Sequence, residues 1–194
     1  MIKAIIFDCF GVLLNDSMDA AVGTLSVSGR LRQDLRDIMN AANLGLLTAK
    51  EAREQHAQVL GISAEEWTQL VASHEGRDTR LFAYILELKK RYKTAILSNV
   101  SEGGISRRFS AGELAQYFDV VVESGAIGVG KPDAEIYEHT LKKLAIMPNE
   151  AIFTDDRDEY CAAAVEAGLS AILFTGFDKF KSDLEELLVA DSNS

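Results

Sequence analysis

Cysteine, basic residues and long hydrophobic runs are all scarce in this sequence. Its 194 residues include two cysteines, Cys9 and Cys161, whose spacing does not suggest a metal site, and we expect both to be reduced thiols. Lysine and arginine number 20 against 30 aspartate and glutamate residues, which gives a formal net charge of −10. Because binding to a phosphate backbone depends on clustered basic side chains, this balance argues against a nucleic-acid partner.

No apolar run approaches the roughly 18 residues of a membrane-spanning helix, so we expect no membrane association. The chain runs from Met1 directly into an apolar strand with no signal peptide, and the sequence therefore predicts a cytoplasmic protein. Hydrophobic residues make up 47% and charged residues 26% of the chain, as in an ordinary globular protein. A chain of this length can bury one core and also carry an insertion.

Residues 2–13 organise the rest of the chain. Ile2 to Phe7 is a short apolar run, long enough for a strand that is buried on both faces and too short for a helix. Asp8 follows at the end of this strand, and Gly11 allows the chain to turn away. Open α/β folds bind ligands at the carboxyl edge of their sheet, so Asp8 is a candidate functional residue. Taken alone, an Asp here is more often a turn former or a helix cap.

Residues 15–76 carry the pattern of helices instead of strands. Capping boxes begin two of these helices, at Thr48 with Glu51 and at Ser63 with Glu66. The apolar residues of an earlier helix recur at the spacing of one helix face: Leu31, Leu35, Ile38 and Met39. We therefore predict a helical cap domain at residues 15–76, inserted where it can cover Asp8 as lids do.

From Asp78 onward, predicted helices and strands alternate. Pro132 suits the first turn of its helix, and only residues 191–194 look loose. The alternation predicts an α/β fold with a Rossmann-like parallel sheet of five strands and helices on both faces, in a core domain of residues 1–14 and 77–194. Helices are expected at about 79–88, 103–118, 132–144, 159–167 and 180–189, and strands at 94–97, 119–123, 151–154 and 170–175.

Polar side chains follow four of the predicted strands or the loops after them. In a parallel sheet these ends lie at one edge, so a carboxylate, a hydroxyl, a cation and a carboxylate pair would converge. Each of them alone could be a turn or a helix cap, but their joint occurrence predicts a functional site. The residues are Asp8, Ser98 with Asn99, Lys131, and Asp155 with Asp156.

The order of these residues resembles that of the haloacid dehalogenase superfamily of hydrolases, from end to end of the chain. Four stretches carry the resemblance: Ile5 to Val12, Ile96 to Asn99, Gly130 to Asp133, and the acidic pair Asp155-Asp156. The resemblance implies a core whose first strand is central and is flanked by the second and the fourth. A cap placed before the Ser98 motif is similar to the subgroup that includes sugar-phosphate phosphatases and haloacid dehalogenases.

The resemblance further implies a Mg²⁺-dependent phosphatase that acts on a small phosphorylated metabolite. Asp8 would attack phosphorus and form an acyl phosphate, which is hydrolysed more easily than the starting ester. Asp8, the Phe10 carbonyl, and Asp155 or Asp156 would hold the Mg²⁺ that relieves repulsion between the two anions. Lys131 and Ser98 would stabilise the transferring group, while Phe10 and Asn99 would contact the substrate.

Phe10 departs from the phosphatases of this family, which carry there a second Asp that acts as acid and base. General acid–base catalysis is typically worth about 10²–10⁴ in rate, so three explanations stay open. In the first, the protein is a phosphatase whose leaving group needs little protonation, or whose proton is supplied by Asp16 or by a residue of the cap. Alternatively, the protein displaces halide, since the dehalogenases carry a Tyr here, although the retained Asp155-Asp156 pair argues against this. The third explanation is a protein that binds a phosphorylated ligand or a protein partner without turnover.

The remaining charged and nucleophilic residues receive no catalytic role from the sequence. Cys9 lies beside the proposed site, but a catalytic thiol would need a base placed near it. Substrate identity and oligomeric state are not predicted. Three arginines, Arg107, Arg108 and Arg157, are candidate phosphate or substrate contacts, although solvated surface charge is the favoured interpretation of each. No role is assigned to His56, His74 or His139.

Overall fold

The computed structural model describes residues 1–25 and 27–192, and within them five parallel strands form one sheet. The strand order is β3-β2-β1-β4-β5, so the first strand is central and is flanked by the second and the fourth, as predicted. The predicted α/β fold with a Rossmann-like parallel sheet is therefore confirmed. The strands are β1 (Ala4–Phe7), β2 (Lys93–Ser98), β3 (Val120–Glu123), β4 (Ala151–Asp155) and β5 (Ser170–Leu173).

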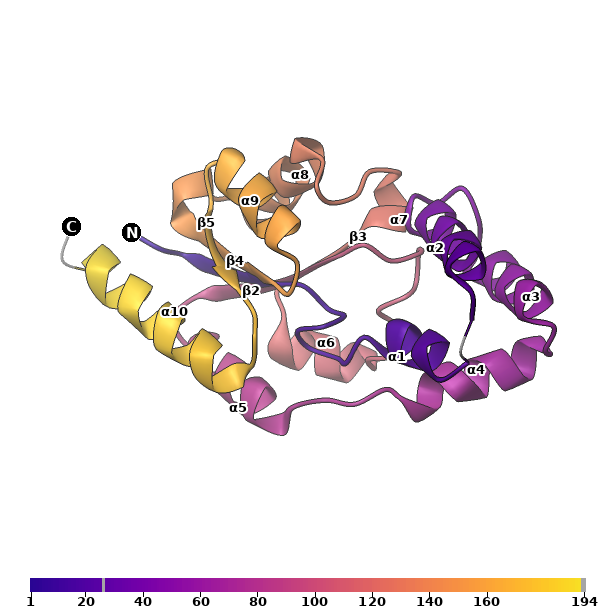
Figure 1. The fold of residues 1–194 in the computed structure, drawn as a ribbon. Helices are drawn as coiled ribbons and strands as arrows, with labels where there is room; N and C mark the ends of the chain where they lie inside the picture. Colours follow the sequence, from indigo (N-terminus) through magenta and orange to yellow (C-terminus); the bar gives the residue numbers. More distant parts are fainter. Residues whose placement is uncertain (26, 193–194) are drawn as a thin grey trace.

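Helices cover both faces of the sheet (Figure 1). In β1, Ile5 and Phe7 face α5 (Thr79–Leu88) and α10 (Phe177–Ser192), and their cluster includes Leu81, Ile85 and Phe180. Ala4 and Ile6 point to the other face, where α8 (Ala134–Leu144) and α9 (Asp158–Glu166) pack. Because neither face of β1 meets solvent, its sequence is apolar throughout instead of alternating.

Among the described residues between β1 and α5, four helices gather beyond the carboxyl ends of the strands, as Figure 1 shows. They pack around their own cluster, which includes Leu35 and Trp67. Both predicted capping boxes are present, each with its two reciprocal hydrogen bonds. The chain leaves for these helices and returns from them side by side, where the Asn15 amide donates to the Gly76 carbonyl at 3.0 Å. The helices are α1 (Ser17–Thr24), α2 (Gly29–Asn43), α3 (Ala49–Leu60) and α4 (Ala64–Ser73).

A short helix of the core meets α2 close to the end of that helix. The element is α7 (Ser124–Ile127), in a stretch that the sequence predicted to be only a glycine-rich turn. The Ser124 hydroxyl donates to the Asn43 carbonyl at 2.5 Å and accepts from the Val100 amide at 3.0 Å. This buried hydroxyl links the four-helix region to the loop after β2.

Several predicted boundaries in the core are wrong. The helix expected from residue 103 begins only with α6 (Ala111–Tyr117), because Ser110 and Glu113 form a capping box and residues 102–108 form turns. Pro132 does not lie in the first turn of a helix. Asp133 is the N-cap of α8, and the Lys131-Pro132 peptide bond is cis. A one-turn 3₁₀ helix, Pro148–Glu150, precedes β4.

The end of the chain is also more ordered than predicted. Strand β5 ends at Leu173 and not at Thr175, and α10 extends to Ser192. Asp191, expected to be loose, accepts the Ile2 amide at 2.6 Å and lies 3.3 Å from the amino terminus of Met1. Residues 193–194, expected to be loose as well, lie outside the described residues. Across the described part of the chain, no helix combines the length and apolar character that crossing a membrane requires.

Candidate active site

The strand register brings the candidate carboxylates together at the carboxyl edge of the sheet. Phe7 pairs with Thr154, so Asp8 and Asp155 follow on neighbouring strands. The Lys131 ammonium lies between them, 2.6 Å from Asp8 Oδ1 and 2.5 Å from Asp155 Oδ2. Burial opposes the charge of Lys131, but the two carboxylates outweigh it and raise the pKa of the ammonium. The predicted cation therefore forms one buried cluster with two of the predicted carboxylates, Asp8 and Asp155.

The environment of Asp8 disfavours its negative charge. The side chain is buried, and burial together with the repulsion of Asp155 raises its pKa to about 7, against the lowering effect of Lys131. A further cation next to Asp8 would lower this pKa and favour the charged carboxylate. The surroundings thus suit a carboxylate that works beside a metal ion.

Three carboxylates can supply oxygen ligands to such an ion. Asp8, Asp155 and Asp156 each offer one oxygen, and these atoms lie within 4.8 Å of one another. The position of Asp156 requires the glycine at residue 11, because a Cβ there would lie 2.3 Å from Asp156 Oδ2, and Gly11 also has a φ of +97°. Oxygen-only ligands are those that hard divalent cations such as Mg²⁺ prefer, so these residues fit that ion.

Lys131 is positioned through its backbone by Asn99. The Asn99 amide group donates to the Lys131 carbonyl at 2.8 Å and accepts from the Lys131 amide, also at 2.8 Å. The chain can approach this closely because residue 130 is a glycine. A Cβ added there would lie 2.9 Å from Asn99 Oδ1. Asn99 was predicted to contact substrate. In this structure both ends of its amide bind the Lys131 backbone, and Asn99 also lines the pocket.

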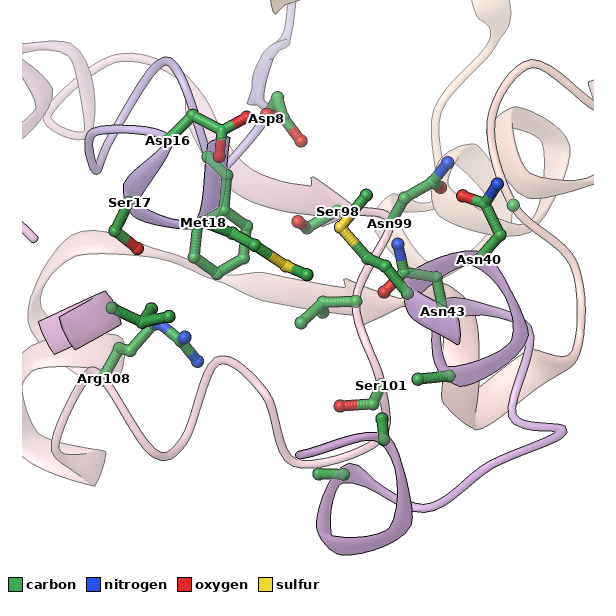
Figure 2. A pocket seen from close by; sticks show the side chains of 18 of the residues that line it. Asp8, Asp16, Ser17, Met18, Asn40, Asn43, Ser98, Asn99, Ser101 and Arg108 are labelled. Carbon is green, nitrogen blue, oxygen red and sulfur yellow. The ribbon is translucent and has the colours of Figure 1, made fainter. Parts of the chain in front are cut away.

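Ser98 presents a buried hydroxyl to the same place. The residue is 1% exposed, and its Oγ has no hydrogen-bond partner among the described residues. A buried hydroxyl without a partner is costly unless a ligand satisfies it. Figure 2 shows Ser98 and Asn99 beside each other on the wall of a pocket that Asp8 also lines. Ser98 is therefore available to donate to a group held next to Asp8.

The pocket has a volume of about 740 Å³ and lies between the sheet edge and helices α1–α4. This is within the range typical of small-molecule sites. The core side is lined by the residues described above, together with Phe10. The helices contribute mainly apolar and a few polar side chains, among them Met18, Met39, Asn40, Asn43, His56, Trp67 and Val71. The helices that were predicted to cover Asp8 thus form one wall of the pocket.

Of the three arginines interpreted as solvated surface charge, Arg107 and Arg157 are exposed and Arg108 is half-buried. Arg107, Arg108 and Arg157 all line the pocket. The turns over residues 102–108 bring the first two back to the sheet edge, and the Arg108 guanidinium lies 4.8 Å from the centroid of the Phe10 ring. The sequence held one signal for Arg107 and Arg108: these adjacent arginines follow the strand whose end carries Ser98 and Asn99.

Tyr160 was missed by sequence reasoning. Its ring centroid lies 5.0 Å from Lys131 Nζ, and its hydroxyl is 3.5 Å from Asn99 Nδ2. Its place in the first turn of α9, soon after Asp155-Asp156, could have identified it. His56 also lines the pocket, and its Nε2 lies 3.0 Å from the Leu35 carbonyl oxygen.

Both cysteines are free, as predicted, and both are buried. Burial, with a smaller contribution from Asp8, raises the pKa of Cys9 well above its usual range. A thiol held neutral in this way is a poor nucleophile.

The carboxyl edge of the parallel sheet thus carries a buried Asp, a buried lysine and a carboxylate cluster. Residues 2–168 match the haloacid dehalogenase-like hydrolase family. The chain belongs to this family. The D-ribitol-5-phosphate phosphatase of Bacteroides thetaiotaomicron is 32% identical to it over 172 residues, which are 80% of this chain and 84% of that protein.

Two solved structures share the fold. One, described as a predicted HAD-like family hydrolase from Porphyromonas gingivalis, has a TM-score of 0.77 at 22% identity, and the match covers 97% of this chain and 98% of that chain. A family enzyme from Bacteroides thetaiotaomicron, solved with magnesium and inorganic phosphate, has a TM-score of 0.74 at 23% identity over 89% of this chain and 93% of that chain. At such identities these two likenesses establish the fold alone.

Proposed function

We propose that this protein is a Mg²⁺-dependent phosphatase that hydrolyses the phosphate ester of a small metabolite through an aspartyl phosphate on Asp8. The observation that carries the proposal is the cluster of Asp8, Asp155 and Asp156 around Lys131, with the unpartnered Ser98 hydroxyl beside it. The name of the D-ribitol-5-phosphate phosphatase, a relative at 32% identity, supports the same class of substrate.

In the proposed reaction, an oxygen of Asp8 attacks phosphorus, a new O–P bond forms, and the bond from phosphorus to the leaving oxygen breaks. Lys131 and Ser98 donate to the oxygens of the transferring group, and Asn99 keeps Lys131 in place. Water then attacks the acyl phosphate, which releases inorganic phosphate and restores Asp8. Mg²⁺, held by Asp8, Asp155 or Asp156 and the Phe10 carbonyl, would supply positive charge to the transferring group.

The proton for the leaving group has to come from a residue other than Phe10. Asp16 is the candidate in this proposal, because it lines the pocket at the start of α1 and lies near Asp8 in Figure 2. Its Oδ1 accepts the Asp19 amide at 3.1 Å, which fixes the side chain at the helix start. A substrate whose leaving group needs little protonation would make this residue dispensable.

The proposal also treats residues 15–76 as a cap domain over a core of residues 1–14 and 77–194. The pairing of Asn15 with Gly76 and the separate cluster around Trp67 support this division. Closure of such a cap would exclude water from the pocket during the first step.

A screen of phosphorylated metabolites and haloacids, with and without Mg²⁺, tests the proposed function. We expect hydrolysis of one or more phosphate esters that stops when Mg²⁺ is removed by a chelator. Release of halide from a 2-haloacid without Mg²⁺ would replace the proposal with a dehalogenase. Binding of phosphate esters without turnover would replace it with a ligand-binding function, in which Phe10 has ended catalysis.

A further inference from the structure

Three arginines gather on the wall of the pocket away from the carboxylate cluster. Arg53 comes from α3, while Arg107 and Arg108 come from the turns after β2, and all three line the pocket. Burial, and the repulsion of Arg108 and Arg53, lower the pKa of Arg107, although Glu123 acts in the opposite direction. Arg107 therefore lies close enough to Arg108 and to Arg53 for its charge to be repelled by both. We call them the arginine cluster.

Few carboxylates balance this cluster. In residues 1–25 and 27–192, the only carboxylate oxygen that we find within 4 Å of it is Glu75 Oε1, which is 3.5 Å from Arg108 Nε. That Nε is buried and has no hydrogen-bond partner within the described chain. Water screens the exposed Arg53 and Arg107, but leaving the buried Arg108 Nε without a hydrogen bond is costly. Three cations beside one close carboxylate are also unexpected in a protein with ten more acidic than basic residues. A bound anion would remove this cost.

Local hydrogen bonds hold two of the guanidinium groups in place. Arg107 donates to the Ser101 hydroxyl at 3.0 Å and to the Glu102 carbonyl at 3.2 Å. Arg108 donates to the Gly104 carbonyl at 3.0 Å and stacks on the Phe10 ring. A guanidinium that is already ordered loses little freedom when it binds a carboxylate or a phosphate, and it can do so with two parallel hydrogen bonds.

The cluster lies apart from the place proposed for the transferring phosphoryl group. That group has Lys131 and Ser98, next to Asp8, whereas Figure 2 shows Arg108 across the pocket from Asp8. Phe10 connects the two regions, since it is two residues after Asp8 in the chain and carries Arg108 over its ring. An ester bound at Asp8 would therefore extend its leaving group toward the cluster.

We propose that the substrate carries a second anionic group, a carboxylate or a further phosphate, which binds to Arg53, Arg107 and Arg108. This inference rests on the proposed phosphatase function and names its substrate class. Because Arg53 belongs to α3 and the other two belong to the core, the second anion would also join the helices over the site to the core.

Three phosphate esters of similar size test the inference: hydroxypropyl phosphate, carboxyethyl phosphate and propanediol bisphosphate. They differ in whether the far end of the leaving group is neutral, a carboxylate or a phosphate. We expect kcat/KM for at least one of the two doubly anionic esters to exceed that of hydroxypropyl phosphate by about tenfold or more, mainly through KM. The preferred ester identifies the second group, and the preference should weaken as ionic strength rises.

Variants of the cluster assign the preference to these side chains. In Arg53→Gln, Arg107→Gln and Arg108→Gln, the ratio of kcat/KM between the preferred ester and hydroxypropyl phosphate should fall several-fold. The matched control is Arg36→Gln, which removes the same charge from an exposed residue of α2 outside the pocket and should leave the ratio unchanged. A ratio that falls equally in Arg36→Gln would mean that the overall charge, and not the cluster, sets the preference.

Equal hydrolysis of all three esters, or a preference for hydroxypropyl phosphate, would overturn the inference and leave the phosphatase proposal standing. Absence of turnover with every ester would count against the phosphatase proposal itself. In that case calorimetry with the Asp8→Asn protein decides the inference. Tighter binding of a doubly anionic ester, lost in the cluster variants, would support a second anion site, and equal binding would overturn it.

Discussion

The Arg108 guanidinium stacks on the Phe10 ring, with its Cζ 4.8 Å from the ring centroid. The position at which related phosphatases were expected to hold an acid therefore carries an aromatic support for a cation. An aromatic ring cannot donate a proton, but the cation above it can attract a developing negative charge. This relationship makes Phe10 the most informative residue to replace.

Replacement of Phe10 by Asp should increase hydrolysis of esters with poor leaving groups. For an alkyl phosphate, whose alkoxide is strongly basic, we expect up to about a hundredfold, the lower end of what acid catalysis contributes, because the pocket was not shaped for a carboxylate. An aryl phosphate should gain much less, since its leaving group departs without a proton. Steady-state rates at saturating Mg²⁺ measure the difference.

Phe10→Asn is the matched control for this variant, because it has nearly the shape of Asp and no acidic proton. An equal effect of the Asp and Asn variants on alkyl phosphates would show that loss of the ring, and not gain of an acid, changes the rate. Unchanged rates in Phe10→Asp, with fold and Mg²⁺ binding intact, would mean that the missing acid does not limit this protein.

Replacement of Asp8 by Asn should reduce phosphate ester hydrolysis to background, because the amide keeps the shape and removes the attacking charge. Circular dichroism should show an intact fold. Asp34→Asn, which changes an exposed carboxylate of α2, serves as the control and should retain full activity. A purified Asp8→Asn protein that keeps more than a few per cent of wild-type activity would contradict a covalent mechanism at this residue.

Replacement of Gly11 by Ala should weaken Mg²⁺ binding by displacing Asp156. The added Cβ would lie 2.3 Å from Asp156 Oδ2, and the φ of +97° is unfavourable for Ala. Gly61→Ala separates these two effects, because Gly61 has a φ of +69° and nothing lies within 4 Å of its added Cβ. Both variants should lose about 1 kcal/mol of stability from the backbone, measured by urea unfolding.

Only Gly11→Ala should lower the affinity for Mg²⁺ in a calorimetric titration. Unchanged Mg²⁺ affinity in a folded Gly11→Ala protein would mean that Asp156 is not a ligand of the ion. A comparable loss of affinity in Gly61→Ala would instead assign the effect to general destabilisation.

His56 should make the stability of the protein fall as the pH falls below about 6.5. Burial lowers the pKa of this histidine from its usual 6.5, although the hydrogen bond to the Leu35 carbonyl acts against this. Above that pH both the folded and the unfolded state hold a neutral imidazole. Below it the unfolded state binds a proton first, so the free energy of unfolding decreases. Urea unfolding at several pH values, in wild type and in His56→Gln, measures this contribution.

The contribution of His56 is the difference in the free energy of unfolding between wild type and His56→Gln at each pH. Asp8, with a pKa raised to about 7, contributes a pH dependence of opposite sign over an overlapping range, and it is present in both. The wild-type value minus that of His56→Gln should decrease toward low pH. A difference that stays constant from about pH 8 to pH 5 would show that His56 takes up its proton equally in both states.

The sequence was sufficient for the sheet and for its functional edge. The strands are short apolar runs, four of which end in or are followed by polar residues, and their alternation with helices indicates a parallel sheet, while the order of the strands came from the resemblance to the family. The capping boxes at Thr48 and Ser63 also fixed the starts of two helices, because such boxes are local in sequence.

The features that sequence reasoning missed depend on contacts between distant residues. The position of Arg108 over Phe10 follows from turns whose shape no periodic pattern specifies. The start of α6 was missed because glycines at 103 and 104 resembled a helix start, whereas the capping box lies at Ser110. The role of Asn99 as a support for Lys131 needed the pairing of two loops that are 32 residues apart.

Because the register of the sheet places the site residues, the site is also sensitive to insertions and deletions within the strands. Phe7 lies opposite Ile96 on one side and Thr154 on the other, and this pairing alone decides that Asp8 and Asp155 emerge together. Removing a single residue from β4 would leave a strand that still pairs and still buries apolar side chains, but successive side chains would exchange faces. Insertions and deletions should therefore be excluded from these strands during evolution, while the connections between the helices above them are free to change in length.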